Sequence, residues 1–128
     1  MLISEAARRS GVSAKLIRYY ESTGLFSRSH RRGNGYRVYD DDHVHELQFI
    51  KRARALGFPI KEIDSLLQLW RNKRRPSSRV RVIAQQHRTR MQERARAFQS
   101  IVGVLDHLIA ACDGDDRPKC PILDELGS

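Results

Sequence analysis

The chain has 128 residues and a formal net charge of +9, so it suits one compact domain or a small domain with one extended element. It has no apolar run long enough to span a bilayer and no signal-peptide pattern, so we expect a cytoplasmic protein with no membrane partner. The charge is uneven: residues 1–75 carry sixteen Lys and Arg against eight Asp and Glu, whereas residues 112–128 carry two against five. The basic head indicates a phosphate-binding surface, and the acidic tail needs a different role.

Two short helices joined by a tight turn are predicted near the N-terminus. The first covers residues 3–11, with Ser4 as its N-cap and Gly11 closing it. The second runs from residue 14 to residue 23, with Ser13 as its N-cap and Gly24 just past its end. This is the layout of a helix-turn-helix, at about residues 4–23. An ordinary helical hairpin has the same spacing, so the side chains must decide between the two.

The side chains of the second helix favour the helix-turn-helix. We expect Leu16 and Ile17 to turn inward and pack. The other face would offer donors and aromatic rings to base edges and phosphates in a major groove. The residues predicted on that face are Lys15, Arg18, Tyr19 and Tyr20.

A β-hairpin is predicted next, because Asn34-Gly35 is a strong signal for a two-residue type I′ turn with positive φ at both positions. Basic and aromatic residues lie on both sides of this turn: Arg31, Arg32, Tyr36, Arg37 and Tyr39. Three arginines so close to the turn favour a wing on the phosphate backbone of DNA over a hairpin that is merely solvated.

A third helix should follow the wing. Acidic residues 40–42 suit its N-terminus, and Gly57 should end it. We predict that it turns its apolar residues inward: Val44, Leu47, Ile50 and Leu56. His43 and His45 are interpreted as surface residues rather than metal ligands. Arg52 and Arg54 would either add contacts to the DNA backbone or be merely solvated.

A fourth helix is predicted to open with Pro59 at its first position. Its apolar stripe has the spacing of a helix packed on one face. The stripe comprises Ile60, Ile63, Leu66, Leu67 and Trp70. A basic linker at residues 71–77, which contains a proline, then separates this head from the rest of the chain.

The longest periodic segment is predicted as a helix over residues 78–111, capped by Ser77 or Ser78. Two seams recur every seven residues, as in a coiled coil of about five heptads. They are Ala84, Met91, Phe98, Leu105 and Cys112, and Val80, His87, Arg94, Ile101 and Leu108. A lone helix leaves such a seam uncovered, so we infer a homodimer. The heptads do not decide whether the two helices run parallel or antiparallel.

The chain resembles the MerR family of bacterial transcription regulators. The resemblance is carried by Ile3-Ser-Glu-Ala-Ala, Ile17-Arg-Tyr-Tyr-Glu, Gly24-Leu25 and Asn34-Gly-Tyr-Arg-Val-Tyr. The tail, Cys112-x7-Cys120-Pro-Ile-Leu, is similar to that of the copper-efflux regulator branch. The resemblance implies a mainly α fold with a winged helix-turn-helix head at 1–70 and a short β-hairpin wing. It further implies a long antiparallel coiled-coil dimerisation helix at 78–111, then a metal-binding loop and tail at 112–128.

The resemblance also implies a function, that of a transcriptional activator for copper efflux and detoxification genes. Lys15 and Arg18 would lie on the recognition helix, with Tyr20, Tyr36 and Arg37 near phosphates. In the family, the metal-bound dimer bends and untwists double-stranded promoter DNA until RNA polymerase can use it. The energy of such a bend, on the order of a few kcal/mol, is within reach of one metal-driven rearrangement.

Cys112 and Cys120 are the two cysteines of the chain, and a short polar loop separates them. Cu(I), Ag(I) and Au(I) are soft ions that accept two thiolates, whereas zinc normally takes four ligands. By the resemblance, the partner's long helix would begin beside this loop, where sensors of divalent metals carry a third cysteine. The matching residue here is Ser77, which favours a monovalent ion. Two thiolates around one monovalent ion leave a net negative charge. The N-terminus of the partner's long helix, together with Arg81, would offset that charge.

Other functions remain open from the sequence alone. Cys112 and Cys120 could form a disulfide, which would make the chain a redox sensor that switches the same DNA-binding head. A regulator with a small-molecule pocket near the helix is a further alternative, although seventeen residues after residue 111 are too few for a separate ligand domain. We do not expect an enzyme, because no nucleophile, base and orienting group stand out together.

Overall fold

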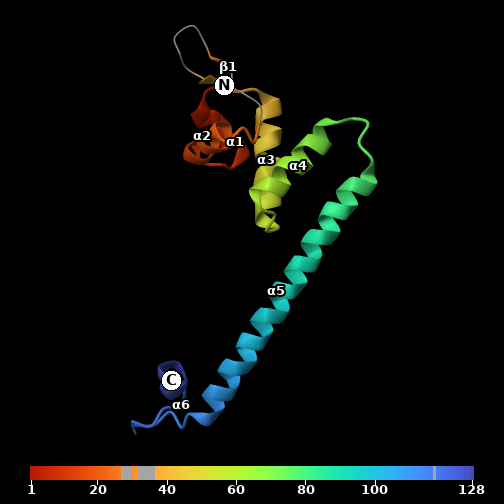
Figure 1. The fold of residues 1–128 in the computed structure, drawn as a ribbon. Helices are drawn as coiled ribbons and strands as arrows, with labels where there is room; N and C mark the ends of the chain where they lie inside the picture. The colour runs from red at the N-terminus through yellow and green to blue at the C-terminus, as the bar shows by residue number, and fades with distance from the viewer. Residues whose placement is uncertain (27–29, 32–36, 117) are drawn as a thin grey trace. The chain divides into compact units, whose positions relative to one another are not determined.

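The computed structural model describes residues 1–26, 30–31, 37–116 and 118–128, and it is mainly helical (Figure 1). Its contacts divide into two units, Met1–Ile83 and Ala84–Ser128. The first unit contains four short helices, a two-stranded hairpin and the start of a long helix. The second contains the rest of that long helix and a short C-terminal helix. None of the helices in the described ranges is long and apolar enough to cross a membrane.

The predicted pair of N-terminal helices is present as α1 (Ile3–Ser10) and α2 (Ala14–Ser22), and α1 packs on α2. Gly11 makes the turn with a φ of 76°, a value that L side chains rarely adopt. The hydroxyl of Ser13 accepts a hydrogen bond from the Leu16 N–H at 3.2 Å, which confirms Ser13 as the N-cap. The prediction for Ser4 was wrong: α1 begins at Ile3, and the Leu2 carbonyl accepts the N–H of Ala6. Ser4 is therefore the second residue of the helix and not its cap.

The end of α2 is a Schellman motif around Gly24, which has a φ of 75°. The N–H of Leu25 donates to the Tyr20 carbonyl and the N–H of Gly24 to the Glu21 carbonyl, both at 3.0 Å. These two bonds satisfy carbonyls that the helix end would leave unpaired. Leu25 is buried beside them, so the predicted stop of this helix is confirmed.

The predicted hairpin is present as β1 (His30–Arg31) and β2 (Arg37–Val38), which pair antiparallel. Its tip, with Arg32, Asn34, Gly35 and Tyr36, lies outside the described residues. Tyr39, expected on the wing, is instead 1% exposed. It exchanges two backbone hydrogen bonds of 2.7 Å with Met1, which draw it into the core.

The third helix, α3 (Asp41–Ala55), begins with a capping box. The Asp40 carboxylate accepts the N–H of His43, and the His43 ring nitrogen Nδ1 accepts the N–H of Asp40, both at 3.0 Å. The prediction that His43 lies on the surface was therefore wrong, because this cap and edge contacts with Phe26 and Tyr39 bury it. His45 is exposed, as expected.

Most of the predicted apolar face of α3 is confirmed, because Val44, Leu47 and Ile50 are buried. Leu56 was predicted wrongly and is 68% exposed. It is the C-cap residue, one position past the last helical residue, so the helical spacing no longer directs it inward. Gly57 follows with a φ of 84° and ends the element as expected.

The fourth helix, α4 (Ile60–Arg71), begins one residue later than predicted, with Pro59 as its N-cap instead of its first residue. Ile63 and Leu67 are fully buried, and Trp70 is 41% exposed. The core of this unit contains residues from all four helices, α1, α2, α3 and α4, and α3 contacts both α1 and α4. Its fully buried members of largest volume are Tyr39, Ile17, Leu47, Ile50, Ile63 and Leu67.

The predicted long helix is α5 (Ser77–Ala111), with 35 residues. It begins at Ser77 itself, and the Pro76 carbonyl accepts the N–H of Arg79, so neither predicted serine is the N-cap. A last helix, α6 (Pro121–Gly127), was not predicted. Cys120 is its N-cap and Pro121 its first residue, where a missing N–H costs nothing.

Candidate metal centre and nucleic-acid interface

The outer face of α2 presents three of its four predicted DNA-contacting residues. Lys15, Arg18 and Tyr19 are exposed, with Tyr19 at 54%. Within the described residues, neither of the two cations is held by an ion pair, so both can meet phosphates or base edges. This is the division that a recognition helix requires.

Tyr20 does not belong to that face, and the prediction that it is exposed was wrong; its contact with DNA stays a prediction. It is 6% exposed and lies in the core with Ile17, three residues earlier on the same side of α2. Leu16 was predicted to turn inward and is instead 44% exposed, beside the basic and aromatic side chains. The three-residue spacing of Ile17 and Tyr20 was the signal that could have separated the two faces.

The hairpin and α3 supply the other predicted DNA contacts. Arg31 and Arg37 are direct cross-strand partners in the hairpin. Asn34, Gly35 and Tyr36 lie outside the described residues. Arg54 is exposed in the last turn of α3. The basic candidates within the first unit therefore come from three different elements.

The two cysteines lie at the two ends of one loop in the second unit. Cys112 directly follows the last residue of α5, and its N–H donates to the Ile109 carbonyl at 3.1 Å. Cys120 is the N-cap of α6, and its carbonyl accepts the N–H of Asp124 at 3.0 Å. Both are free thiols and half-buried. The backbone of each cysteine is thus held at the end of a helix, and Gly114 turns the loop between them with a φ of 67°.

After this loop the chain returns along α5. Glu125 of α6 lines a pocket of about 510 Å³ together with α5 residues, among them Val104, His107 and Leu108. Figure 1 shows α6, in dark blue, beside the last turns of α5. The reversal makes Cys112 and Cys120 the ends of a closed turn and not of an extended tail.

Ser77 and Arg81, the predicted supports of the metal site, are exposed at the other end of α5. A continuous α-helix rises about 1.5 Å per residue, so the ends of this helix are about 50 Å apart. Across the part of the chain that the structure describes, no three His, Cys, Asp or Glu side chains gather into a site for a metal ion.

A corner held by hydrogen bonds joins the head to α5. The guanidinium of Arg75 donates to the carbonyls of Trp70 and Asn72 at 3.3 and 3.2 Å, which satisfies the C-terminal end of α4. The last residue of α4, Arg71, donates through Nε to Glu46 of α3 at 2.6 Å. The predicted linker is therefore ordered, and an ion pair with a nearly buried carboxylate fixes the helix before it.

Comparisons with known proteins agree with this arrangement. Residues 1–70 match the model of the MerR HTH family of regulatory proteins, and residues 44–108 match the model described as MerR, DNA binding. The chain is 46% identical over 128 residues to heavy metal-dependent transcription regulator 2 of Rhizobium meliloti, which covers 100% of this chain and 87% of that protein. It is 36% identical over 126 residues to the transcriptional regulator CueR of Salmonella typhimurium, with 98% and 91% covered.

Among solved structures, the crystal structure of the transcription regulator PbrR691 from Ralstonia metallidurans in complex with lead(II) is similar, with a TM-score of 0.85. It shares 29% sequence identity, and the match covers 98% of both chains. These relatives are transcriptional regulators and not enzymes. The chain belongs to the MerR family of helix-turn-helix regulatory proteins.

Proposed function

We propose that this regulator senses Cu(I) through Cys112 and Cys120 and then activates transcription of copper efflux genes. Ag(I) and Au(I) have the same coordination chemistry and are the alternative effectors. The observation that carries the proposal is the pair of free, half-buried thiols at the two ends of the α5–α6 loop. When bound, the ion would link two helix ends through sulfur and so change how the loop holds α6.

The donor set fits a soft monovalent ion. A thiolate is a soft ligand, whereas the other ionisable side chains of the loop are hard carboxylates, an arginine and a lysine. Soft monovalent ions are satisfied by two thiolates, and zinc normally needs four ligands. The chain contains only these two cysteines, so a site with more thiolate ligands would need both copies of a dimer.

The DNA side of the proposal rests on the exposed cations of the head. Lys15, Arg18 and Arg54 have no ion pair within the described residues, which leaves them available to phosphates of promoter DNA. We propose a homodimer, paired along α5, as the binding species. On a single chain, α5 exposes large apolar side chains, among them Phe98, Ile101 and Leu105. RNA polymerase would use the promoter that the metal-bound dimer distorts.

A soft divalent ion is the second candidate, because PbrR691 was crystallised with lead(II). The curated Rhizobium relative is named only as heavy metal-dependent, which fits either ion class. Against the divalent ion stands Ser77, whose hydroxyl cannot replace a thiolate as a soft ligand. In an antiparallel dimer this residue would lie beside the partner's loop.

Competition for Cu(I) against a chelator of known affinity, with reduced protein, tests the proposal. We expect Cu(I) to bind far more tightly than Zn(II) or Pb(II), and Cys112→Ser and Cys120→Ser each to lower the Cu(I) affinity by at least about 100-fold. Asp116→Asn is the matched control, since it replaces a carboxylate of the same loop by a neutral amide and should leave the affinity nearly unchanged. Tighter binding of Zn(II) or Pb(II) by the unaltered protein would overturn the assignment.

The same affinity measurement on Ser77→Cys tests why the site would prefer monovalent over divalent ions. If this residue lies beside the partner's loop, a third thiolate should raise the affinity for Pb(II) or Zn(II) by about tenfold or more. An unchanged divalent affinity would contradict the placement of Ser77 at the site. The redox alternative predicts a different result, a switch in DNA binding on oxidation of the thiols with no metal present.

A further inference from the structure

One leucine lies on the outer surface of the helix-turn-helix. Leu16 is the third residue of α2, and its side chain is 44% exposed. Its N–H donates to the Ser13 hydroxyl at 3.2 Å, which holds the backbone of Leu16 in the first turn of the helix. A single exposed leucine is ordinary on most of a protein surface, so the meaning of this one depends on its position.

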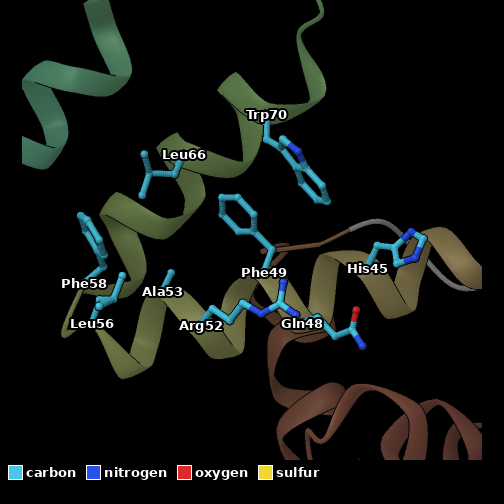
Figure 2. A pocket seen from close by; sticks show the side chains of 9 residues that line it. All are labelled: His45, Gln48, Phe49, Arg52, Ala53, Leu56, Phe58, Leu66 and Trp70. Atoms are coloured by element: carbon cyan, nitrogen blue, oxygen red, sulfur yellow. The ribbon is translucent and has the colours of Figure 1, made fainter. Parts of the chain in front are cut away.

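Two other large apolar side chains of the first unit are exposed but pack on a neighbouring ring. Trp70 is 41% exposed, and its ring stacks on Phe49 with centroids 4.8 Å apart and planes 16° from parallel. Figure 2 shows this pair between α3 and α4. Tyr19 is 54% exposed, and its ring centroid lies 5.9 Å from that of Tyr20 in the core. Leu16, in the described part of the chain, belongs neither to the core nor to the residues packed against it.

The helical period places Leu16 on α2 relative to the predicted DNA contacts. Ile17 and Tyr20 are buried and mark the inner side of this helix. Lys15 and Tyr19 lie on the opposite side, because each residue turns an α-helix by about 100°. Leu16 comes three residues before Tyr19, so the two side chains are neighbours at the edge of the outer face. That face thus combines a cation, a phenol and a branched apolar side chain.

The first turn of the second helix is where a helix-turn-helix reads bases. Residues in the N-terminal part of a recognition helix contact base edges in the major groove. Lys15 can donate to a phosphate or to a guanine there. Leu16 has no side-chain donor or acceptor. The base feature that suits it is the C5-methyl of thymine, the apolar group that base edges present in this groove.

We propose that Leu16 sets part of the operator specificity by packing on the C5-methyl of a thymine. The inference rests on the proposed binding of promoter DNA by α2 and adds a base-reading residue to it. The contact would remove apolar surface of both partners from water. Burial of one methyl-sized group is worth about fourfold in affinity, so a dimer on two half-sites would gain about 15-fold.

Replacement of thymine by deoxyuridine tests this contact, because it removes the methyl group and keeps the O4 acceptor. The operator is first selected from random duplexes with the reduced protein in the absence of metal. Each thymine of the selected operator is then replaced in both half-sites together, and the Kd is measured by fluorescence anisotropy at constant salt. We expect one position per half-site at which loss of the methyl group weakens binding, by about 15-fold for the pair.

Substitutions of two equally exposed leucines show whether Leu16 reads that methyl group. In Leu16→Ala the deoxyuridine penalty should fall below about twofold, because the contact is already absent. Leu16→Met keeps an apolar side chain of similar volume and should retain most of the penalty. Leu2→Ala is the matched control. Leu2 is 43% exposed and lies just before α1, so its variant should keep the full penalty.

The outcomes separate this inference from the proposed function. If the methyl group acts through the stiffness of the DNA, Leu16→Ala will show the same penalty as the unaltered protein, and the proposal is overturned. An operator in which no thymine methyl group affects binding would overturn it as well. Failure of the protein to select any sequence would contradict promoter binding itself. No metal enters this assay, so its result is independent of the proposed copper response.

Discussion

Asp40 and His43 together decide where α3 begins. The His43 backbone N–H donates to the Asp40 carboxylate and holds the pKa of that carboxyl below its ordinary value of 3.8, against the smaller opposing effect of burial. The ionised form is therefore the one that stabilises the helix start. Its contribution is complete above pH 3.8 and is lost as the pH falls through the lower pKa of the folded state.

The first prediction concerns this cap. Asp40→Ala should lower the free energy of unfolding by about 1 kcal/mol at neutral pH, the usual cost of losing an N-cap. Asp40→Asn should cost less, because asparagine also caps helices. Urea unfolding at fixed protein concentration measures both, and the gap between the unaltered protein and Asp40→Asn should close below pH 3.8. Equal losses in both variants would contradict the role of the side-chain oxygen.

For single residues, the sequence predicts the features that depend on neighbours along the chain. The caps at Ser13 and Asp40 and the stop at Gly24 are confirmed, since each depends on bonds within a few residues. Tyr20 and His43 were misplaced because contacts with distant elements decide their burial. A polar or aromatic side chain can serve the core or the surface, and local spacing alone does not choose.

An ion pair links α3 to the C-terminal end of α4, shortly before the chain enters α5. Glu46 and Arg71 form a 2.6 Å ion pair there, and their side chains are 10% and 37% exposed. Arg75 then caps the end of α4 through two carbonyls. These bonds resist rotation of the last turn of α4, so they define how the start of α5 leaves the head.

The second prediction tests the ion pair between Arg71 and Glu46. Arg71→Ala should lower the free energy of unfolding by about 2 kcal/mol, as for a hydrogen bond to a charged group. Arg74→Ala is the control, because in the described chain its side chain makes no hydrogen bond or ion pair, and it should change stability by less than about 0.5 kcal/mol. Urea denaturation followed by circular dichroism measures both variants. Similar losses in the two would show that the ion pair contributes little.

The existence of the five helices from α1 to α5 and of the hairpin could be predicted, because each has a periodic pattern or a turn signal. Helix α6 could not, since seven residues are too few for a helix to be stable by propensity alone. Its position beside α5 is a tertiary effect.

The long helix α5 carries an apolar side that is exposed on a single chain. Phe98, Ile101 and Leu105 are 67%, 53% and 47% exposed on α5, at positions of the predicted seams. One chain leaves this surface in water, which is unfavourable in proportion to its apolar area. The metal site as predicted is also a property of two chains, because Ser77 and Cys112 lie at opposite ends of α5.

The third prediction follows from that seam. Ile101→Glu should weaken the dimer by at least about tenfold, because it would bury a charge at the helix contact. Gln99→Glu adds the same charge on the same turn, outside the seams, and should leave association nearly unchanged. Sedimentation equilibrium of both variants gives the measurement. Two dimers of equal stability would contradict pairing along this seam.

The sequence predicted an apolar seam on a long helix and a pair of thiols. The proposed dimer and its complete metal site need a second copy of the chain. Heptad spacing depends only on which residues share a helix face, so it is visible in the sequence. The direction of the partner helix and the neighbours of each cysteine depend on a second copy. The roles of Ser77, Arg81 and the partner's loop therefore remain predictions.

Transcription in vitro from the protein's own promoter tests the central claim most directly. Reduced protein, RNA polymerase and buffered Cu(I), Ag(I), Zn(II) or Pb(II) are combined, and the transcript is quantified. The account predicts activation by Cu(I) or Ag(I) and not by Zn(II) or Pb(II), with complete loss in Cys112→Ser and retention in Asp116→Asn. Activation by a divalent ion alone, or activation that survives Cys112→Ser, would contradict it.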